Sequence, residues 1–490
     1  MKKIILVPLD DRPCNFKFPV QIASSRGIEV ITPPKEYLGR YNDPGDPEKI
    51  LYWLDEVSGE ADSAVISSDM ICYGGLVASR KNTVHLDDAL RRISFLDGLK
   101  NKNPELNISV FSVLMRLSVT ADSQDNKALW KDIFEYSVLS DKAERFPEPG
   151  DKKKLNELEA KLPRGIIDSY LAVRERNRRV NEACIDLAAS GHADLVVIAK
   201  EDCARFGLHK KEEYGLKNRV ENKMLCERVK FLNGADEISM CLLSRRILSS
   251  CNEHPKIAVR YSFGKGRDIS LYEDAPLDRV VSDHIDLLGV IRVEPLKEAE
   301  KVIFVHSFEG EQRDLIFSQE VERDRDQSHH LKNFCSEIIM MGEIGKEAIV
   351  ADVFYANGAD RDFLDKFSKL GDPKSILSYA GWNTSSNSVG SALSAALLSG
   401  NRELLLLRYI EDIGYQTVVR KRLEAFLDGK GISPFDFKES YAEAEEFASR
   451  EMRTWADGFF SAIGLKERPE IKISFPWKRT FEADCDIIFS

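Results

Sequence analysis

The sequence contains no run approaching the roughly 18–20 consecutive apolar residues that cross a membrane as a helix. Its first residues carry two lysines and a short apolar stretch, but Asp10, Asp11 and Arg12 interrupt that stretch too early for a signal peptide. We therefore expect a cytoplasmic protein with no membrane partner. The first apolar stretch is interpreted as a buried strand.

The sequence also has no CxxC pair, and its nine cysteines are scattered and odd in number. This pattern favours reduced thiols over a disulfide framework or a zinc ribbon. Cys203 lies beside two acidic residues, so a nucleophilic role has to be weighed against a small buried residue lining a site. The second role is favoured, because no histidine lies in a local arrangement that suggests a partner.

Recognisable cofactor motifs are missing as well. We find no Gly-rich loop followed by Lys-Ser or Lys-Thr, no GxGxxG after the first strand, and no HExxH. We expect no cofactor and no dedicated metal ligands, but a Mg²⁺ or Ca²⁺ site of Asp10, Asp69 and Asp352 stays open because oxygen ligands need no fixed spacing. The net charge of −11 argues against a nucleic-acid partner, since phosphate binding needs a concentrated basic surface.

What is present is a large core and a strand–helix alternation. The 490 residues exceed the roughly 250–300 at which one core stops growing, and 43% of them are hydrophobic. In the first half, short apolar runs alternate with amphipathic stretches, which predicts βα units around a parallel sheet. The expected strands are Ile4–Leu9, Glu29–Thr32, Ser63–Ser68, Ile108–Met115, Leu195–Lys200 and Val229–Asn233, and the expected helices are Asp46–Glu56, Leu86–Leu99, 123–189 with a break near 146–150, and Lys210–Arg228.

The second half breaks this rhythm before restoring it. We expect the strands Lys256–Ser262, Val290–Val293 and Lys301–Ser307, with a helix at Leu277–Leu288, to form a small inserted α/β module. Glu347–Tyr355 and Ser375–Gly381 return to strands that finish in polar residues, and residues from 401 onward are largely helical.

Eight expected strands end in polar residues, and an eight-stranded (β/α)8 barrel collects such ends at one mouth. We therefore predict an α/β fold with a barrel of this type. Its strands 1–6 lie in residues 1–254, the module in 255–345, strands 7 and 8 in 346–400, and a helical region in 401–490. The competing architecture is an open doubly wound sheet, which also binds ligands at the carboxyl ends of its strands.

The strand Leu195–Lys200 runs directly into Glu201 and Asp202, our first candidates for catalysis. Successive side chains on a strand point to opposite faces, so these acids could share a site only where the strand has ended and the backbone turns. Two carboxyl groups held close together would split their pKa values, leaving one protonated and one ionised. The alternative is a helix N-terminus whose acids favour the helix dipole.

Carboxylates, amides and aromatic rings are expected at the same mouth, a combination that suits a sugar. The predicted substrate-binding residues are Asp10, Arg12, Asp69, Tyr73, Arg116, Asp236, Asp352, Asn357, Trp382 and Asn383. Two alternatives stay open: Trp382 as a buried packing residue, and Asp10 with Arg12 as a structural ion pair.

Four long motifs carry a resemblance to a known family. They are LVPLDDRPCN at 6–15, SDMICYGGLVASR at 68–80, YANG at 355–358 and AGWNT at 380–384. Over nearly its whole length the chain resembles the bacterial family catalogued as domain of unknown function 4127. The resemblance implies a glycosidase acting on β-linked N-acetylhexosaminides, notably N-acetylgalactosamine.

The resemblance to barrel-fold N-acetylhexosaminidases also implies roles for the acid pair. In their substrate-assisted scheme the first acid orients the acetamido group, which attacks the anomeric carbon, and the second is the general acid/base. Glu201 would then orient the group and Asp202 would protonate the leaving oxygen. The family more often has Gln-Asp-Asp where this chain has Lys200-Glu201-Asp202, and this departure affects the division of roles.

From these observations we predict an exo-acting, retaining β-N-acetylhexosaminidase with a small carbohydrate as its substrate. Two other functions stay open: a carboxylate-bound metal-dependent hydrolase or isomerase, and a sugar-binding protein without catalysis. The sequence makes no prediction of the oligomeric state.

Overall fold

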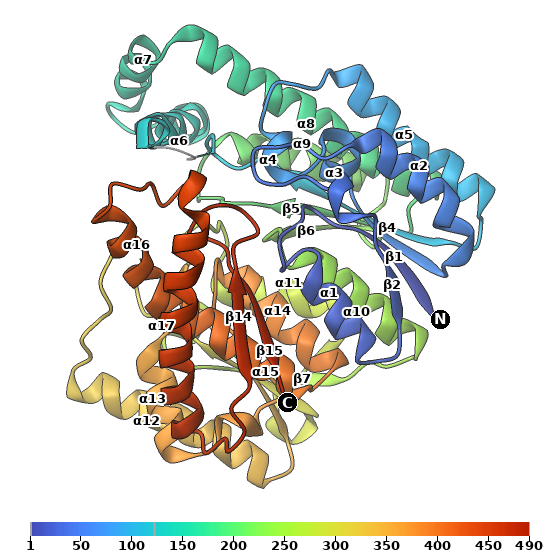
Figure 1. The fold of residues 1–490 in the computed structure, drawn as a ribbon. Helices are drawn as coiled ribbons and strands as arrows, with labels where there is room; N and C mark the ends of the chain where they lie inside the picture. The colour runs from blue at the N-terminus through green and yellow to red at the C-terminus, as the bar shows by residue number, and fades with distance from the viewer. Residues whose placement is uncertain (1, 121–123, 490) are drawn as a thin grey trace. The chain divides into compact units, whose positions relative to one another are not determined.

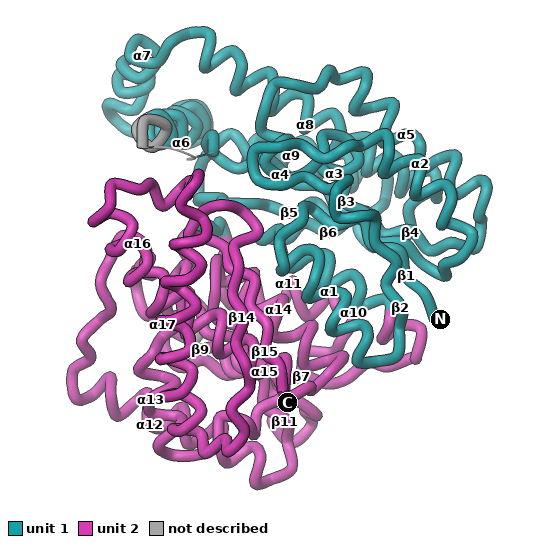
Figure 2. The backbone as a smooth tube through the Cα atoms, in the orientation of Figure 1, with its two compact units in different colours: residues 1–246, 272–274 teal, residues 247–271, 275–490 magenta. Residues whose placement is uncertain are grey.

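A computed structural model describes residues 2–120 and 124–489 of the chain. The polypeptide divides into two compact units, residues 1–246 with 272–274 and residues 247–271 with 275–490 (Figure 2). Each unit is built on its own parallel sheet (Figure 1). None of the helices in the described part of the chain is long and apolar enough to cross a bilayer.

The first unit contains an open six-stranded sheet with the strand order β2-β1-β3-β4-β5-β6, and every neighbouring pair is parallel. Its strands are β1 (Lys3–Val7), β2 (Glu29–Ile31), β3 (Ser63–Ser67), β4 (Asn107–Leu114), β5 (Leu195–Lys200) and β6 (Val229–Asn233). All six lie where the apolar runs predict strands. The order reverses between β1 and β3, and this makes a switch point of the kind at which doubly wound sheets bind ligands.

Helices connect these strands in the predicted alternation. They are α1 (Lys17–Ser24), α2 (Pro47–Val57), α3 (Ser68–Tyr73), α4 (Leu76–Ser79), α5 (Leu86–Lys102), α6 (Gln124–Arg145), α7 (Asp151–Lys161), α8 (Arg164–Ser190), α9 (Leu208–Asn222) and α10 (Ile238–Ser250), the last of which crosses the boundary between the units. Local signals set their ends: Asp46 caps α2 by accepting the Lys49 N–H, and Gly191 at φ +79° terminates α8. The expected break near 146–150 separates α6 from α7, while position 123, the expected start of that helical stretch, lies outside the described residues.

The two faces of this sheet are covered by different helices. Ile5 and Val7 of β1 pack with α2, α5, α8 and α9 in one hydrophobic core. Ile4 and Leu6 are equally buried and point to the opposite face, the face on which α1 lies (Figure 1). A strand buried on both sides needs a continuous apolar run, which explains why β5 reads Leu-Val-Val-Ile-Ala.

The second unit contains an open five-stranded parallel sheet with the order β13-β11-β9-β7-β8. Its strands are β7 (Lys256–Tyr261), β8 (Ile291–Arg292), β9 (Lys301–His306), β11 (Glu347–Asp352) and β13 (Ser378–Ala380), and two small sheets pair β10 (Arg313–Asp314) with β12 (Tyr355–Ala356) and β14 (Glu470–Ser474) with β15 (Asp484–Ile488). The helices are α11 (Leu277–Leu288), α12 (Arg325–Glu343), α13 (Arg361–Leu370), α14 (Ser385–Leu398), α15 (Arg402–Arg408), the π-helix Tyr409–Val419, α16 (Arg420–Asp428) and α17 (Tyr441–Ala462).

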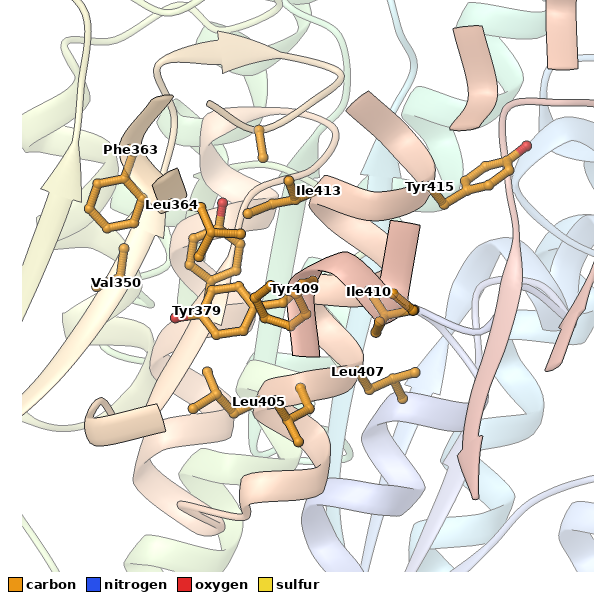
Figure 3. Close-up of a cluster of buried hydrophobic side chains, with 14 of the residues drawn as sticks. Val350, Phe363, Leu364, Tyr379, Leu405, Leu407, Tyr409, Ile410, Ile413 and Tyr415 are labelled. Atoms are coloured by element: carbon orange, nitrogen blue, oxygen red, sulfur yellow. The ribbon is translucent and has the colours of Figure 1, made fainter. Parts of the chain in front are cut away.

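The C-terminal helices belong to the core of this second sheet. Val350 of β11 and Tyr379 of β13 share a buried cluster with Leu405 of α15 and with Tyr409 and Ile410 of the π-helix (Figure 3). The same cluster includes side chains of α17 and β14. Residues 401–490 therefore complete the second unit and do not form a separate helical layer.

This architecture corrects two predictions. The eight polar strand ends come from two open sheets, six from the first and two from the second, so the described strands form no closed (β/α)8 barrel. The expected module 255–345 is not an insertion, because its strand β9 pairs along its length with β11 of the expected second barrel part. The sequence pattern shows that strands end in polar residues, but pairing partners depend on long-range contacts that periodicity does not encode.

Candidate functional site

The carboxyl edge of the first sheet brings the two acids of the Lys200-Glu201-Asp202 segment together. The strand ends at Lys200, and Asp202 adopts a left-handed backbone conformation with φ of +40°. Because the backbone turns there, both carboxylates reach one side chain: Arg116 Nη1 lies 3.8 Å from Glu201 Oε1, and Arg116 Nη2 pairs with Asp202 Oδ2. The turn thus meets the condition under which adjacent acids can share a site.

Glu201 is held by a second arginine that the sequence analysis did not single out. Arg80 pairs with Glu201 Oε1 and also donates from Nη1 to Thr120 Oγ1 at 3.0 Å. Burial lowers the pKa of Arg80 to about 10, against the opposing pull of Glu201, so Arg80 stays charged at neutral pH. Glu201 Oε2 is buried and makes no hydrogen bond within residues 2–120 and 124–489, which leaves one acceptor oxygen available for a ligand.

A side chain of α8, Arg174, holds the backbone at Arg116 in place. The buried guanidinium of Arg174 donates to the carbonyls of Arg116 and Met115, at 2.7 and 3.1 Å, and pairs with Glu212 at 2.6 Å. These bonds fix the backbone where β4 ends. The Arg174-Glu175-Arg176-Asn177 segment belongs to the stretch expected to be helical, but its sequence gives no sign that this arginine braces a strand end.

A second arginine fork joins the ends of β1 and β6. Arg12 Nη2 lies 2.7 Å from Asp10 Oδ2 and 2.6 Å from Asp236 Oδ1, and the three side chains are almost completely buried. Asn15 donates to Asp10 Oδ1 at 2.9 Å and to Asp236 Oδ1 at 3.3 Å. A bidentate, buried arginine of this kind fixes geometry more than it adds stability, because desolvation offsets much of the attraction.

Asp69 enters the same edge at the start of α3, directly after β3. Its Oδ2 accepts the Val113 N–H at 2.9 Å. Burial raises the pKa of Asp69 to about 6, with a further contribution from the negative charge of Glu201. Burial also raises the pKa of Asp236 to about 6 despite Arg12, and Glu201 adds to that shift too. Carboxyl groups from β3, β5 and β6 thus share one electrostatic environment, with some poised to hold a proton near neutral pH.

Tyr73 contacts the hydrophobic core of the first unit and the side chain of Arg176. Its ring belongs to the hydrophobic core of the first unit, and the Arg176 guanidinium lies 4.4 Å from the ring centroid. Its hydroxyl is buried and has no hydrogen-bond partner in the described part of the chain. A substrate-binding role for Tyr73 stays a prediction.

The remaining predicted residues belong to the second unit, at the carboxyl ends of β11 and β13. Both oxygens of Asp352 are engaged internally, Oδ1 by the Phe354 N–H and Oδ2 by the Asp360 N–H and the Tyr379 hydroxyl. Asn357 has a φ of +58° and donates from its side chain to Asp314 Oδ2 at 2.9 Å. These bonds account for the polarity of Asp352 and Asn357 without a ligand.

Trp382 and Asn383 follow β13 in the same unit. The Trp382 ring packs 5.6 Å from that of Phe481, and its side chain is only 6% exposed. Its Nε1 has no hydrogen-bond partner among the residues that the structure describes. Asn383 has a φ of +67°, and its carbonyl accepts the Asn357 N–H at 2.9 Å. Their part in substrate binding stays a prediction.

Asp10 and Asp69, two members of the carboxylate metal site that the sequence left open, have separate bonding partners. The Asp10 oxygens accept bonds from Arg12 and Asn15, whereas Asp69 accepts the Val113 N–H. Asp352, the third, lies in the other unit. Within the described ranges, the one group of three side chains suited to a metal ion is a different one, Cys203, His209 and Asp274.

Comparison with known proteins gives a family and no activity. The sequence model of a family described as "Protein of unknown function (DUF4127)" matches residues 4–486. No curated protein matches. Among solved structures, the carboxyl transferase domain of Rhizobium etli pyruvate carboxylase with pyruvate and biocytin matches at 10% identity, with 92% of this chain and 56% of that chain covered and a TM-score of 0.21.

A second structure of the carboxyl transferase domain from Rhizobium etli pyruvate carboxylase matches at 11% identity, over 92% of this chain and 57% of that chain, with a TM-score of 0.19. The chain thus spans little more than half the length of the structures it matches. Likeness at this level carries no functional argument.

Proposed function

The chain belongs to the DUF4127 family of proteins of unknown function, and from that premise we propose that it is a glycoside hydrolase. We propose an exo-acting β-N-acetylhexosaminidase, with N-acetylgalactosaminides favoured, that acts through the Glu201–Asp202 pair. Its partner would be a small carbohydrate, and its nine cysteines, scattered and odd in number, fit a reducing cytoplasm.

The observation that carries this proposal is the turn at Asp202. It presents two adjacent carboxylates to one arginine, Arg116, and leaves Glu201 Oε2 buried without a bonding partner among the described atoms. The Asp202 side chain is 24% exposed, against 13% for Glu201, so Asp202 is the more accessible of the two. A pair of carboxyl groups, one accessible and one held, is what acid/base cleavage of a glycosidic bond needs.

The division of roles follows from the arginines. Glu201 contacts both Arg80 and Arg116, whereas Asp202 pairs with Arg116. A carboxylate held by two arginines suits the task of accepting the acetamido N–H and orienting its carbonyl oxygen toward the anomeric carbon. Asp202 would then protonate the leaving oxygen and afterwards activate the water that opens the cyclic intermediate.

The sugar hydroxyls would be bound by the polar side chains around this pair. Asp69 and Asp236 share the electrostatic environment of Glu201, and Arg12 fixes Asp236 and Asp10 in a single geometry. Preformed groups of this kind cost little to organise when a ligand binds.

The test is the release of nitrophenol from aryl N-acetyl-β-hexosaminides by the full chain. If the assignment is right, Asp202→Asn and Glu201→Gln each lower kcat/KM by about 10²–10⁴-fold, since that is the usual cost of losing an acid/base group. Glu221→Gln, an exposed acid on α9, is the matched control and should leave the rate unchanged.

Azide gives a second readout. It should restore activity to Asp202→Asn but not to Glu201→Gln, because a small anion can replace a lost carboxylate nucleophile or base but not an orienting group that holds the acetamide. Full activity in both acid variants would sink the proposal. Activity that disappears with EDTA would favour a metal-dependent hydrolase instead. Saturable binding of the monosaccharide without turnover would favour a sugar-binding protein.

A further inference from the structure

A cluster of three side chains that can bind a metal lies next to the acid pair and includes Cys203 of the loop from β5 to α9. Cys203 Sγ, a ring nitrogen of His209 and a carboxylate oxygen of Asp274 all lie within 4.8 Å of one another. Cys203 follows Asp202 in sequence, His209 is the second residue of α9, and Asp274 belongs to the 272–274 segment of the first unit. The Cys203 N–H donates to the Tyr272 carbonyl at 2.7 Å, which ties that segment to the loop.

His209 is the most weakly paired polar group in this cluster. The residue is 1% exposed, and neither of its ring nitrogens makes a hydrogen bond within residues 2–120 and 124–489. The nearest opposite charge is Asp274 Oδ2, 3.5 Å from His209 Nε2. A buried imidazole whose only partner is this distant is poorly satisfied, and a metal ion is the kind of ligand that would satisfy it.

Two lysines compete for the same carboxylate. Lys200 Nζ lies 2.7 Å from Asp274 Oδ1 and Lys210 Nζ lies 2.6 Å from Asp274 Oδ2, while Glu213 balances both cations. A carboxylate has about four lone-pair sites, so each oxygen can accept an ammonium group and still bind a metal. The lysines would nonetheless weaken the site, because their charge repels a cation.

We propose that Cys203, His209 and Asp274 form a site for a divalent cation of the zinc class, with three protein ligands and one open position. Thiolate and imidazole together favour Zn²⁺ over Mg²⁺ and Ca²⁺, which take oxygen ligands. Zn–S and Zn–N bonds of about 2.3 and 2.0 Å place ligand atoms closer than the 4.8 Å limit found here, so binding requires a closure of about 1 Å.

Protonation sets the conditions for this binding. The thiolate, and not the thiol, is the metal ligand, so Cys203 must lose its proton when the ion binds. Zinc would form a bond to Cys203 sulfur as the thiol proton leaves to solvent, with no change in oxidation state. The bound ion would fix the loop that carries Glu201 and Asp202, whatever reaction those acids perform.

The experiment uses the full chain, stripped of metal and titrated with Zn²⁺ or Co²⁺. We expect about one Zn²⁺ per chain, a rise in Tm with zinc, and a thiolate-to-cobalt charge-transfer band. Cys203→Ser should abolish the band, and His209→Gln and Asp274→Asn should each weaken zinc binding by at least about 10-fold. Cys184→Ser, a buried thiol elsewhere in the same unit, should change neither.

Lys210→Gln separates a metal site from an ion-pair cluster. Removing one competing cation should tighten zinc binding several-fold, whereas a purely structural cluster would only lose stability. Circular dichroism confirms that each variant is folded. The proposal is overturned if the wild-type chain binds no zinc, if Cys203→Ser binds it equally well, or if Lys210→Gln binds it more weakly.

Discussion

Carboxylates follow the strands of both sheets, but their exposure and their bonding partners differ between the two carboxyl edges. At the first edge, Glu201 and Asp202 are partly exposed and are paired to Arg80, at the end of α4, and Arg116, which follows β4. At the second edge, Asp352 and Asp360 are 1–2% exposed, and their partners are backbone amides, Tyr379, His306 and Arg323. The first arrangement leaves an acceptor open for a ligand, while the second uses its acceptors to hold the chain together.

The pKa values of the carboxyl groups also differ between the two edges. Burial pushes the pKa of Asp360 upward, but the bonds from His306 and Arg323 outweigh it and hold the pKa below its usual value. Asp69 at the first edge has no paired cation within residues 2–120 and 124–489, and burial raises its pKa to about 6. Polar strand ends therefore do not identify a site by themselves. The bonding partners of each carboxylate determine whether it is available to a ligand or stabilises the fold.

The largest expected effect comes from removing one arginine at each edge. Arg323→Gln should destabilise the protein by about 3–5 kcal/mol, because Asp360 then keeps a buried charge with one partner fewer. Arg116→Gln should instead lower kcat/KM by about 10²-fold with little change in stability, because it misplaces both acids. Urea unfolding and aryl glycoside turnover measure the two effects, and an exchange of the outcomes would reverse the assignment of the edges.

The next effect concerns pH. Asp69 has a folded pKa of about 6 against its usual 3.8, so between these values the folded state binds more protons than the unfolded state. Its contribution to stability therefore falls as pH rises from about 4 to 6 and stays low above that, by about 2–3 kcal/mol. Asp69→Asn should flatten this part of the stability profile and raise stability at pH 7.5, provided that the Val113 bond is kept.

Unfolding curves from pH 4.5 to 8 check this prediction. Asp62→Asn is the control: backbone bonds from Lys2 and Lys3 hold the pKa of that exposed carboxyl below its usual value, so it titrates below this pH range and its removal should leave the slope unchanged. A wild-type profile that rises with pH over this range, with no change of slope in Asp69→Asn, would contradict the buried acid at the first edge.

The smallest effect tests whether Asn383 of the second edge serves the backbone or a ligand. With a φ of +67°, Asn383→Gly should be almost neutral, whereas Asn383→Ala should cost about 1–2 kcal/mol because the left-handed conformation strains a Cβ. Thermal unfolding compares the two variants. A large loss of kcat/KM in a stable Asn383→Gly protein would instead assign this residue to substrate binding, as its position after β13 predicts.

Much of this molecule was accessible from sequence because it rests on local patterns. Apolar runs located all six strands of the first sheet, and the polar residues after them located Asp10, Asp69, Arg116 and the Glu201–Asp202 pair. The GGLVASR motif contains Arg80, but nothing in it indicated that this arginine pairs with Glu201. The four motifs also indicated the family, which the match over residues 4–486 confirms.

Tertiary structure decided the rest. Periodicity shows that a strand exists but not which strand it pairs with, so eight polar ends suggested one barrel where the chain builds two open sheets. The same limit concealed the link between Cys203 and Asp274, because 71 residues separate them in sequence and only folding brings their ligand atoms within 4.8 Å. His209 lies only six residues after Cys203, so the prediction that Cys203 has no local histidine partner was wrong. Local sequence determines which residues end a strand, and long-range packing determines which strands pair and which side chains those residues contact.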